Sequence, residues 1–187
     1  YLIGMSLRQD ALSNLPEANR NGTFFGGSVG YRLSEEEFFK NSGVKNIMND
    51  VKIRGSYAEV GNVEIGFFPY QNQFGAGRYG SQNGASFSQA GNPNLQWETS
   101  KKINVGADFG FLDNKINLVF DYFINDIDGL ILNAPTVPSV GIPGNSISQN
   151  VGAVSNSGLE FTVNASPINK NGFRWDVSAN FTSLNNE

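Results

Sequence analysis

Cysteine and histidine are both absent from the 187 residues of this chain. Without cysteine there is no disulfide framework and no thiol nucleophile, and without histidine the common zinc and iron sites and the histidine-based catalytic triads are excluded. We therefore expect no metal and no cofactor, nominate no catalytic residue, and predict that the protein is not an enzyme.

Basic clusters and long apolar runs are also missing. The formal net charge is −4 and lysine and arginine are scattered, so nucleic acid is not an expected partner. No stretch approaches the roughly 20 consecutive apolar residues of a transmembrane helix, and residues 1–20 lack the pattern of a signal peptide. Strands that expose only alternate side chains to lipid stay possible, because their average hydropathy is mildly polar.

Aromatic residues make up 12% of the chain and glycine numbers 22, a composition typical of many strands joined by tight turns. Seven segments alternate between apolar and polar or small residues. In one of them, Ile103 and Val105 alternate with Asn104 and Gly106. The fold class is predicted to be all-β, with antiparallel strands at residues 1–10, 24–33, 51–57, 102–111, 116–125, 159–166 and 173–182.

Alternation alone fits a soluble sandwich as well as a membrane barrel. Five of the seven predicted strands are 10 residues long, which is long for a soluble sheet and enough to cross a bilayer at a tilt. Short turns at 112–115 and 167–172 alternate with long segments at 62–96 and 129–152, as in outer-membrane barrels. We therefore predict a transmembrane β-barrel segment in which 62–96 and 129–152 are extracellular loops.

Residues 34–50 form an unusually long connection for the opposite end of such a barrel. Ser34 to Glu37 has the form of a capping box and is followed by Phe38 and Phe39. The sequence predicts a helical turn that lies along the rim, with its aromatic side chains at the membrane interface.

Several segments in the same order resemble the C-terminal part of the barrel in SusC/RagA-type TonB-dependent outer-membrane receptors of Bacteroidetes. The segments that carry this resemblance are Gly30–Glu36, Val51–Tyr57 with Val60–Asn62, Gly91–Thr99, Asp121–Phe123 and Asn150–Glu160.

The resemblance implies that residues 1–187 are part of a barrel of about 22 strands. It also implies an N-terminal plug, contact with the TonB complex through a segment upstream of this chain, surrounding outer-membrane lipid and a SusD-like surface lipoprotein. The implied cargo is an oligosaccharide or a peptide. Seven strands is an odd number and the plug is absent, so we expect that the chain does not transport alone and that further sequence follows it.

The long segment 62–96 contains the candidate ligand-binding residues. Aromatic rings on an outer loop suit stacking against sugar rings, although they equally suit packing of the loop itself. The candidates are Phe68, Tyr70, Phe74, Tyr79 and Phe87, with Phe67 beside them.

Three further patterns are assigned structural roles. Asn125–Gly129 has carboxylates but lacks the later bidentate glutamate of a calcium loop, so we interpret it as a solvated strand end. The glycine-rich stretches 75–80 and 141–145 lack the lysine and helix of a phosphate site. Aromatic residues near strand ends are predicted to form an interfacial girdle: Tyr31, Trp97, Phe111, Phe173 and Trp175.

Two alternatives stay open at this point. A soluble secreted β-sandwich that binds carbohydrate or mediates adhesion would cover its apolar face with a second sheet and fold without detergent. An outer-membrane enzyme would need a nucleophile and a base, which a chain without histidine supplies poorly.

Overall fold

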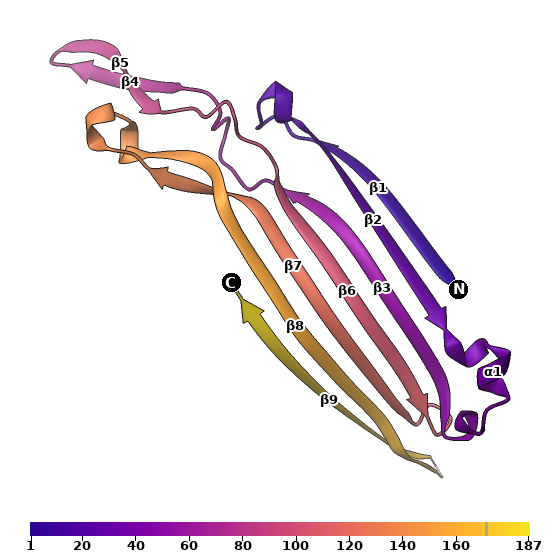
Figure 1. Ribbon diagram of the computed structural model, residues 1–187. Coiled ribbons are helices and arrows are strands. Elements are labelled where there is room, and N and C mark those ends of the chain that lie inside the picture. Colours follow the sequence, from indigo (N-terminus) through magenta and orange to yellow (C-terminus); the bar gives the residue numbers. More distant parts are fainter. Residues whose placement is uncertain (171) are drawn as a thin grey trace.

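The computed structural model describes residues 1–170 and 172–187, and in this part of the chain seven long strands form one antiparallel sheet in the order β1-β2-β3-β6-β7-β8-β9 (Figure 1). Each predicted strand is present, so the all-β, antiparallel prediction is confirmed. The strands of this sheet are β1 (Leu2–Ala11), β2 (Asn21–Arg32), β3 (Met48–Asn62), β6 (Glu98–Phe111), β7 (Ile116–Pro135), β8 (Ser146–Lys170) and β9 (Phe173–Asn186).

A separate two-stranded sheet, β4 (Gln73–Tyr79) and β5 (Gln82–Gln89), lies within the predicted loop 62–96. Its two-residue turn begins with Gly80 at φ 62°, a conformation that glycine adopts readily. A two-residue Gly-Ser turn between alternating segments is a recognised hairpin signal, and it was missed because the surrounding residues are mostly glycine, glutamine and serine.

The connections sort to the two ends of the large sheet. One end, here called the hairpin end, carries η1 (Glu17–Asn19), the β4–β5 hairpin and the loop with η4 (Pro138–Val140) and η5 (Pro143–Asn145) (Figure 1). The other, the α1 end, carries η2 (Leu33–Glu35), α1 (Glu37–Lys40), η3 (Gly43–Asn46) and the turn 112–115. In the described part of the chain, every helix is too short or too polar to cross a membrane.

Strand pairing places most of the large apolar residues on one face, with exceptions such as Val119 and Phe123, which pair with Asp108 and Asn104 of the polar face. Across the middle of the sheet, Ala107 pairs with Phe120, Phe120 with Phe161, and Phe161 with Phe181. This apolar face is open: Met5 is 89% exposed and Phe181 65%. Within the described residues no second sheet packs on it, so the prediction made by the β-sandwich alternative is wrong.

The predicted loop 129–152 is mostly strand. β7 and β8 continue to pair as far as Pro135 and Ser146, with register shifts around Leu130, and leave only 136–145 as a loop. The prediction ended these strands too early because Asp128 and Gly129 together indicate a turn. In the structure Gly129 (φ 68°) lies in the irregular part of the ladder instead. At the other side of β8, the predicted turn 167–172 is shorter, since β8 continues to Lys170, and its residue Asn171 lies outside the described residues.

The helical prediction for 34–50 is confirmed, but the capping box is wrong. α1 begins at Glu37 with Glu36 as its N-cap, and no side chain caps it. Ser34 is buried instead and its hydroxyl donates to the Asp50 carboxylate at 2.8 Å. The serine of the motif lies two residues before the actual N-cap, and it ties the connection to the start of β3 instead.

A small core lies at the hairpin end. Leu15 and Leu95 are fully buried, and Phe24 (7% exposed) packs edge-on against Trp97 with ring centroids 5.6 Å apart. Trp97 therefore supports this core and is not part of the girdle, which corrects its predicted role. Gly61 is required here, since a Cβ atom on it would overlap the Phe24 ring.

Candidate functional site

The candidate aromatic residues of segment 62–96 form two pairs. Phe74 and Phe87 face each other across the β4–β5 ladder, with ring centroids 5.5 Å apart. Phe68 and Tyr70 meet edge-on at the base of the hairpin, with centroids 6.2 Å apart. Each pair leaves ring surface in solvent, since Phe74 is 67% exposed and Phe68 40%.

Tyr79 stands apart from both pairs. It is 91% exposed and lies at the tip of the hairpin. Because side chains alternate along a strand, Tyr79 also lies on the face opposite Phe74. The five candidates are therefore brought to one hairpin and its base but not into one pocket.

Backbone-directed hydrogen bonds fix the base of the hairpin. The Gln89 side-chain amide donates to the carbonyl oxygens of Phe68 and Gln71, both at 3.2 Å, and the Gln73 amide donates to the Phe67 carbonyl at 2.9 Å. Such bonds hold the loop aromatics in place without using the rings themselves, so the rings are free for contacts with another molecule.

A second set of contacts holds segment 91–98 against β7 and β8. The Asn150 amide donates to the carbonyl oxygens of Gln96 (2.9 Å) and Gly129 (2.7 Å), and its oxygen accepts from the Gln96 N–H at 3.1 Å. Glu98 is buried and accepts from the Ile131 N–H at 2.8 Å and from the Asn62 amide at 2.9 Å. Sequence reasoning found both segments by their resemblance to the family but did not assign these roles, because the partners are more than 20 residues away.

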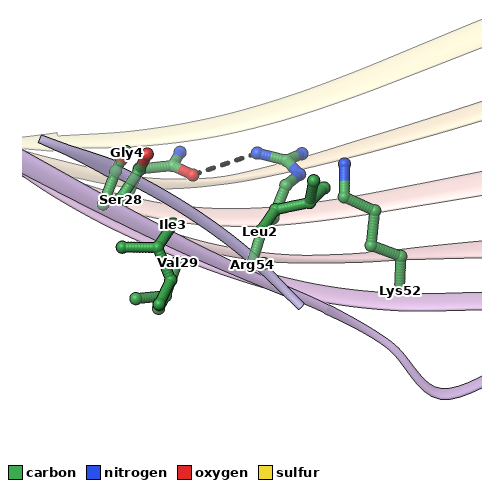
Figure 2. Close-up of a pocket in the computed structure, with 11 residues that line it drawn as sticks. Leu2, Ile3, Gly4, Ser28, Val29, Lys52 and Arg54 are labelled. Carbon is green, nitrogen blue, oxygen red and sulfur yellow. Dashed lines mark hydrogen bonds between the residues drawn. The ribbon is translucent and has the colours of Figure 1, made fainter.

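Charged side chains meet in the middle of the polar face. The Arg54 guanidinium donates to Asp121 at 2.6 Å, to Asp108 at 3.3 Å and to Asn104 at 3.2 Å, the last drawn in Figure 2. Asp121 lies two strands away from Arg54, and Gly106 lies between them in the row. A Cβ atom at Gly106 would come within 2.5 Å of Asp121 Oδ1, so glycine is what allows Arg54 to reach across.

The polar face is hollowed beside this charge cluster. A depression of about 400 Å³ is bounded by Lys52 and Arg54 and floored by Gly4, Ser28 and Gly30 (Figure 2). These small residues on β1 and β2, with Ser56 on β3, leave the space, and Lys52 and Arg54 lie at its side. The polar face is therefore suited to contact with water or with a polar chain.

The apolar face comes close in height to the apolar band of an outer-membrane barrel. On β6 it extends from Ile103 to Phe111, eight residue steps that correspond to roughly 20 Å along a barrel axis at about 3.3 Å per residue and a tilt of about 40°. Apolar bands of outer-membrane barrels are about 25 Å tall.

Beyond Ile103, toward the hairpin end, the same face carries charged residues that lie opposite one another on neighbouring strands. Glu59 lies opposite Lys101, and Lys101 lies opposite Asp126. Lys101 is ion-paired to Asp128 at 2.9 Å, and the Ser155 hydroxyl donates to Asp126 at 2.6 Å. The carboxylates of Asn125–Gly129 thus have separate partners on strands, which agrees with their structural interpretation.

At the α1 end the apolar face finishes in aromatic residues. Tyr31 stacks on Tyr1 with centroids 4.8 Å apart, and Phe111, Phe173 and Trp175 continue the face on β6 and β9. Four of the five predicted girdle residues therefore lie at this end of the apolar face. Among residues 1–170 and 172–187, no group of three acidic side chains is arranged to hold a metal ion.

Comparison with known proteins agrees with this arrangement. The whole chain, residues 1–187, matches the family described as TonB dependent receptor-like, beta-barrel. Over its full length the chain is 35% identical to the TonB-dependent receptor P39 of Formosa agariphila and 34% identical to the TonB-dependent receptor SusC of Bacteroides thetaiotaomicron. It covers 18% and 19% of those two proteins.

Solved structures give the same result. In the RagAB peptide importer in its open-open state, a part of one chain aligns with 99% of this chain at a TM-score of 0.88 and 27% sequence identity. The closed-closed state of the same importer aligns at a TM-score of 0.87 and 28% identity. In each case 20% of the longer chain is covered.

The sheet is open and antiparallel, with one exposed apolar face and one polar face. These features identify this chain as a wall segment of a transmembrane β-barrel. The chain belongs to the TonB-dependent receptor β-barrel family, and the predicted resemblance to SusC- and RagA-type proteins is confirmed. It spans about one fifth of the length of the relatives that it matches. The relatives that it matches are named as TonB-dependent receptors, and the solved structures as a peptide importer.

Proposed function

We propose that this chain is part of the barrel wall of an outer-membrane transporter that imports glycans or peptides. The observation that carries the proposal is the pairing of a tall, exposed apolar face with a polar, hollowed face on the same seven strands. The first face suits lipid and the second suits a lumen. Energy would come through the TonB complex, which contacts parts of the protein outside this chain.

The hairpin end is the proposed extracellular end. The long, elaborated connections lie there, including the β4–β5 hairpin and the loop 136–145, as outer loops do in barrels of this kind. The α1 end, with its tight turn at 112–115, is then periplasmic.

The topology can be tested by proteolysis of intact cells that produce the full-length receptor. Cleavage is expected within 62–96 and 136–145, and protection is expected at 112–115. Cleavage at 112–115 together with protection of the hairpin would invert the proposed topology.

The hairpin aromatics are the proposed contact surface for cargo or for a SusD-like lipoprotein that covers the outer mouth. Phe74, Phe87 and Tyr79 offer ring surface on both faces of a projecting ribbon, and Phe68 and Tyr70 offer it at the base. Aromatic side chains have few rotatable bonds and lose little side-chain entropy on binding, which favours stacking on sugars and on aromatic side chains of peptides.

Binding measurements on the full-length receptor, with and without its lipoprotein, test this surface. Tyr79→Ala and the double variant Phe74→Ala/Phe87→Ala are expected to weaken binding of cargo or lipoprotein by about 1 to 3 kcal/mol for the ring contacts that are lost. Val137→Ala is a matched control, because Val137 is also an exposed apolar residue at the hairpin end (62%). Unchanged binding in both aromatic variants would limit these rings to packing of the loop.

A further inference from the structure

Exposed apolar side chains gather at the α1 end, on the connection between β2 and β3. Phe38 is 64% exposed, Ile47 63% and Val44 50%, and Leu112 from the neighbouring turn is 50% exposed. A soluble surface rarely leaves several large apolar side chains so close together without a partner. This group of four is called the rim patch below.

The segment that carries the rim patch is held in place by contacts within the protein. Phe39, next to Phe38, is buried, and the Ser42 hydroxyl donates to the Phe39 carbonyl. Before the patch, Ser34 is hydrogen-bonded to Asp50, and Arg32 is ion-paired with the same carboxylate at 3.4 Å. Phe38 is thus directed away from the protein by a segment that is fixed on both sides of it.

The rim patch is continuous with the apolar face of the sheet. The Leu112 N–H donates to the Ile47 carbonyl at 3.0 Å, which joins the patch to the turn that follows Phe111. On the next residues, Met48 pairs with Phe111, whose side chain belongs to the apolar face. At the α1 end, the apolar face therefore continues into the rim patch with no row of charged residues between them. At the hairpin end, by contrast, the apolar face ends at the row of charged residues that includes Glu59 and Lys101.

Helices of this length cannot cross a bilayer, but a short apolar segment with polar neighbours suits the headgroup layer. Glu37, Lys40, Lys45 and Asn46 alternate with the apolar residues and supply groups for water and lipid headgroups. We propose that residues 33–47, together with Leu112, form an interfacial anchor that inserts Phe38, Val44 and Ile47 into the phospholipid leaflet at the α1 end. The proposal rests on the membrane assignment of the apolar face and goes beyond it.

Spin labels on the full-length receptor, reconstituted in vesicles of phosphatidylethanolamine and phosphatidylglycerol, test the anchor. This chain contains no cysteine, so a single introduced cysteine is unique within it, and cysteines elsewhere in the receptor are replaced beforehand. Labels at Phe38→Cys and Ile47→Cys are expected to collide with oxygen several-fold more than with a water-soluble nickel complex. Labels at Glu37→Cys and Val140→Cys are expected to show the reverse preference.

The controls separate the anchor from the membrane assignment. Val140 is as exposed as Ile47 (61%) but lies at the hairpin end, so it shows that apolar character alone does not give the lipid signal. A label at Ile103→Cys, inside the apolar face, reports whether the wall faces lipid at all. If Ile103 reports lipid while Phe38 and Ile47 are open to nickel, or are shielded from both reagents by protein, the anchor is overturned and the wall assignment stands. If Ile103 is open to nickel, the membrane assignment itself fails.

Discussion

The two faces of the seven-stranded sheet respond to opposite demands. On the apolar face, side chains such as Met5 and Phe181 are exposed and have few protein neighbours. The size of a side chain there has little effect on stability, whereas its apolar or charged character has a large one. On the polar face, Arg54 reaches Asp121 over Gly106, and a single added carbon would collide with the ion pair. The comparison teaches that lipid determines what the first face is made of, whereas neighbouring side chains determine the shape of the second.

The largest expected effect comes from a charge on the apolar face. Phe161 lies in the middle row of that face, between Phe120 and Phe181. Phe161→Arg is expected to destabilise the folded receptor in lipid by about 2 to 4 kcal/mol, since an arginine at the bilayer midplane must leave water. Unfolding of the full-length receptor in vesicles by guanidinium measures it. Thr162→Arg, one residue away on the polar face, is the matched control and is expected to change stability by less than about 1 kcal/mol.

Substitutions at Gly106 and Gly55 test the effect of side-chain size on the two faces, where the previous pair tested the effect of charge. Gly106→Ala is expected to cost about 2 kcal/mol or more because the new methyl group displaces Arg54 or Asp121 from a partly buried pair. Gly55→Ala, on the apolar face beside Arg54, meets only ordinary contacts near 3.9 Å and is expected to be close to neutral. Equal melting temperatures for the two variants would contradict the view that only the polar face is crowded.

The hydrogen bonds of Asn150 lie at the hairpin end of the sheet, where they test how much polar contacts stabilise the loops. Asn150→Ala removes two bonds that hold segment 91–98 at Gln96 and one bond to Gly129, and it leaves the Gln96 and Gly129 carbonyls without this partner. A loss of about 1 to 3 kcal/mol is expected, together with faster proteolysis of segment 62–96. Asn164→Ala, which loses only a bond from Ser178 at an exposed site, serves as the control. An unchanged proteolysis rate for Asn150→Ala would show that the hairpin is held by other contacts.

The smallest effect concerns an exposed ion pair at the α1 end. The hydrogen bond from Lys40 to Glu35, at 2.8 Å, lowers the pKa of the Glu35 carboxyl below its ordinary value. A lowered folded-state pKa gives stability that is present above the ordinary glutamate pKa and is lost as the pH falls through the lowered value. Lys40→Met is therefore expected to reduce the melting temperature slightly at pH 7 and not at a pH where Glu35 is protonated. A difference that persists in acid would assign the effect to packing of Lys40 instead.

Much of the wall was predictable because its signal is local. Alternation along each strand reports which side chains share a face, so residues 102–111 and 116–125 could be assigned strand by strand. The β4–β5 hairpin was missed because glycine and glutamine contribute little to such a pattern, and the extension of β7 was missed because Asp128 and Gly129 indicate a turn. The two aromatic pairs of the hairpin required the ladder register, which places Phe74 beside Phe87 but Tyr79 on the other face.

The sequence by itself determined that this chain builds long antiparallel strands with one apolar and one polar side, since a period of two is a property of every extended backbone. Only the tertiary structure decided that the seven apolar sides merge into one open surface and that Arg54 crosses Gly106 to Asp121. It alone placed Trp97 in a core, and it alone showed that Phe39 is buried while its neighbour Phe38 is exposed. Those outcomes depend on register between strands distant in sequence, and a shift of one residue would have exchanged the faces.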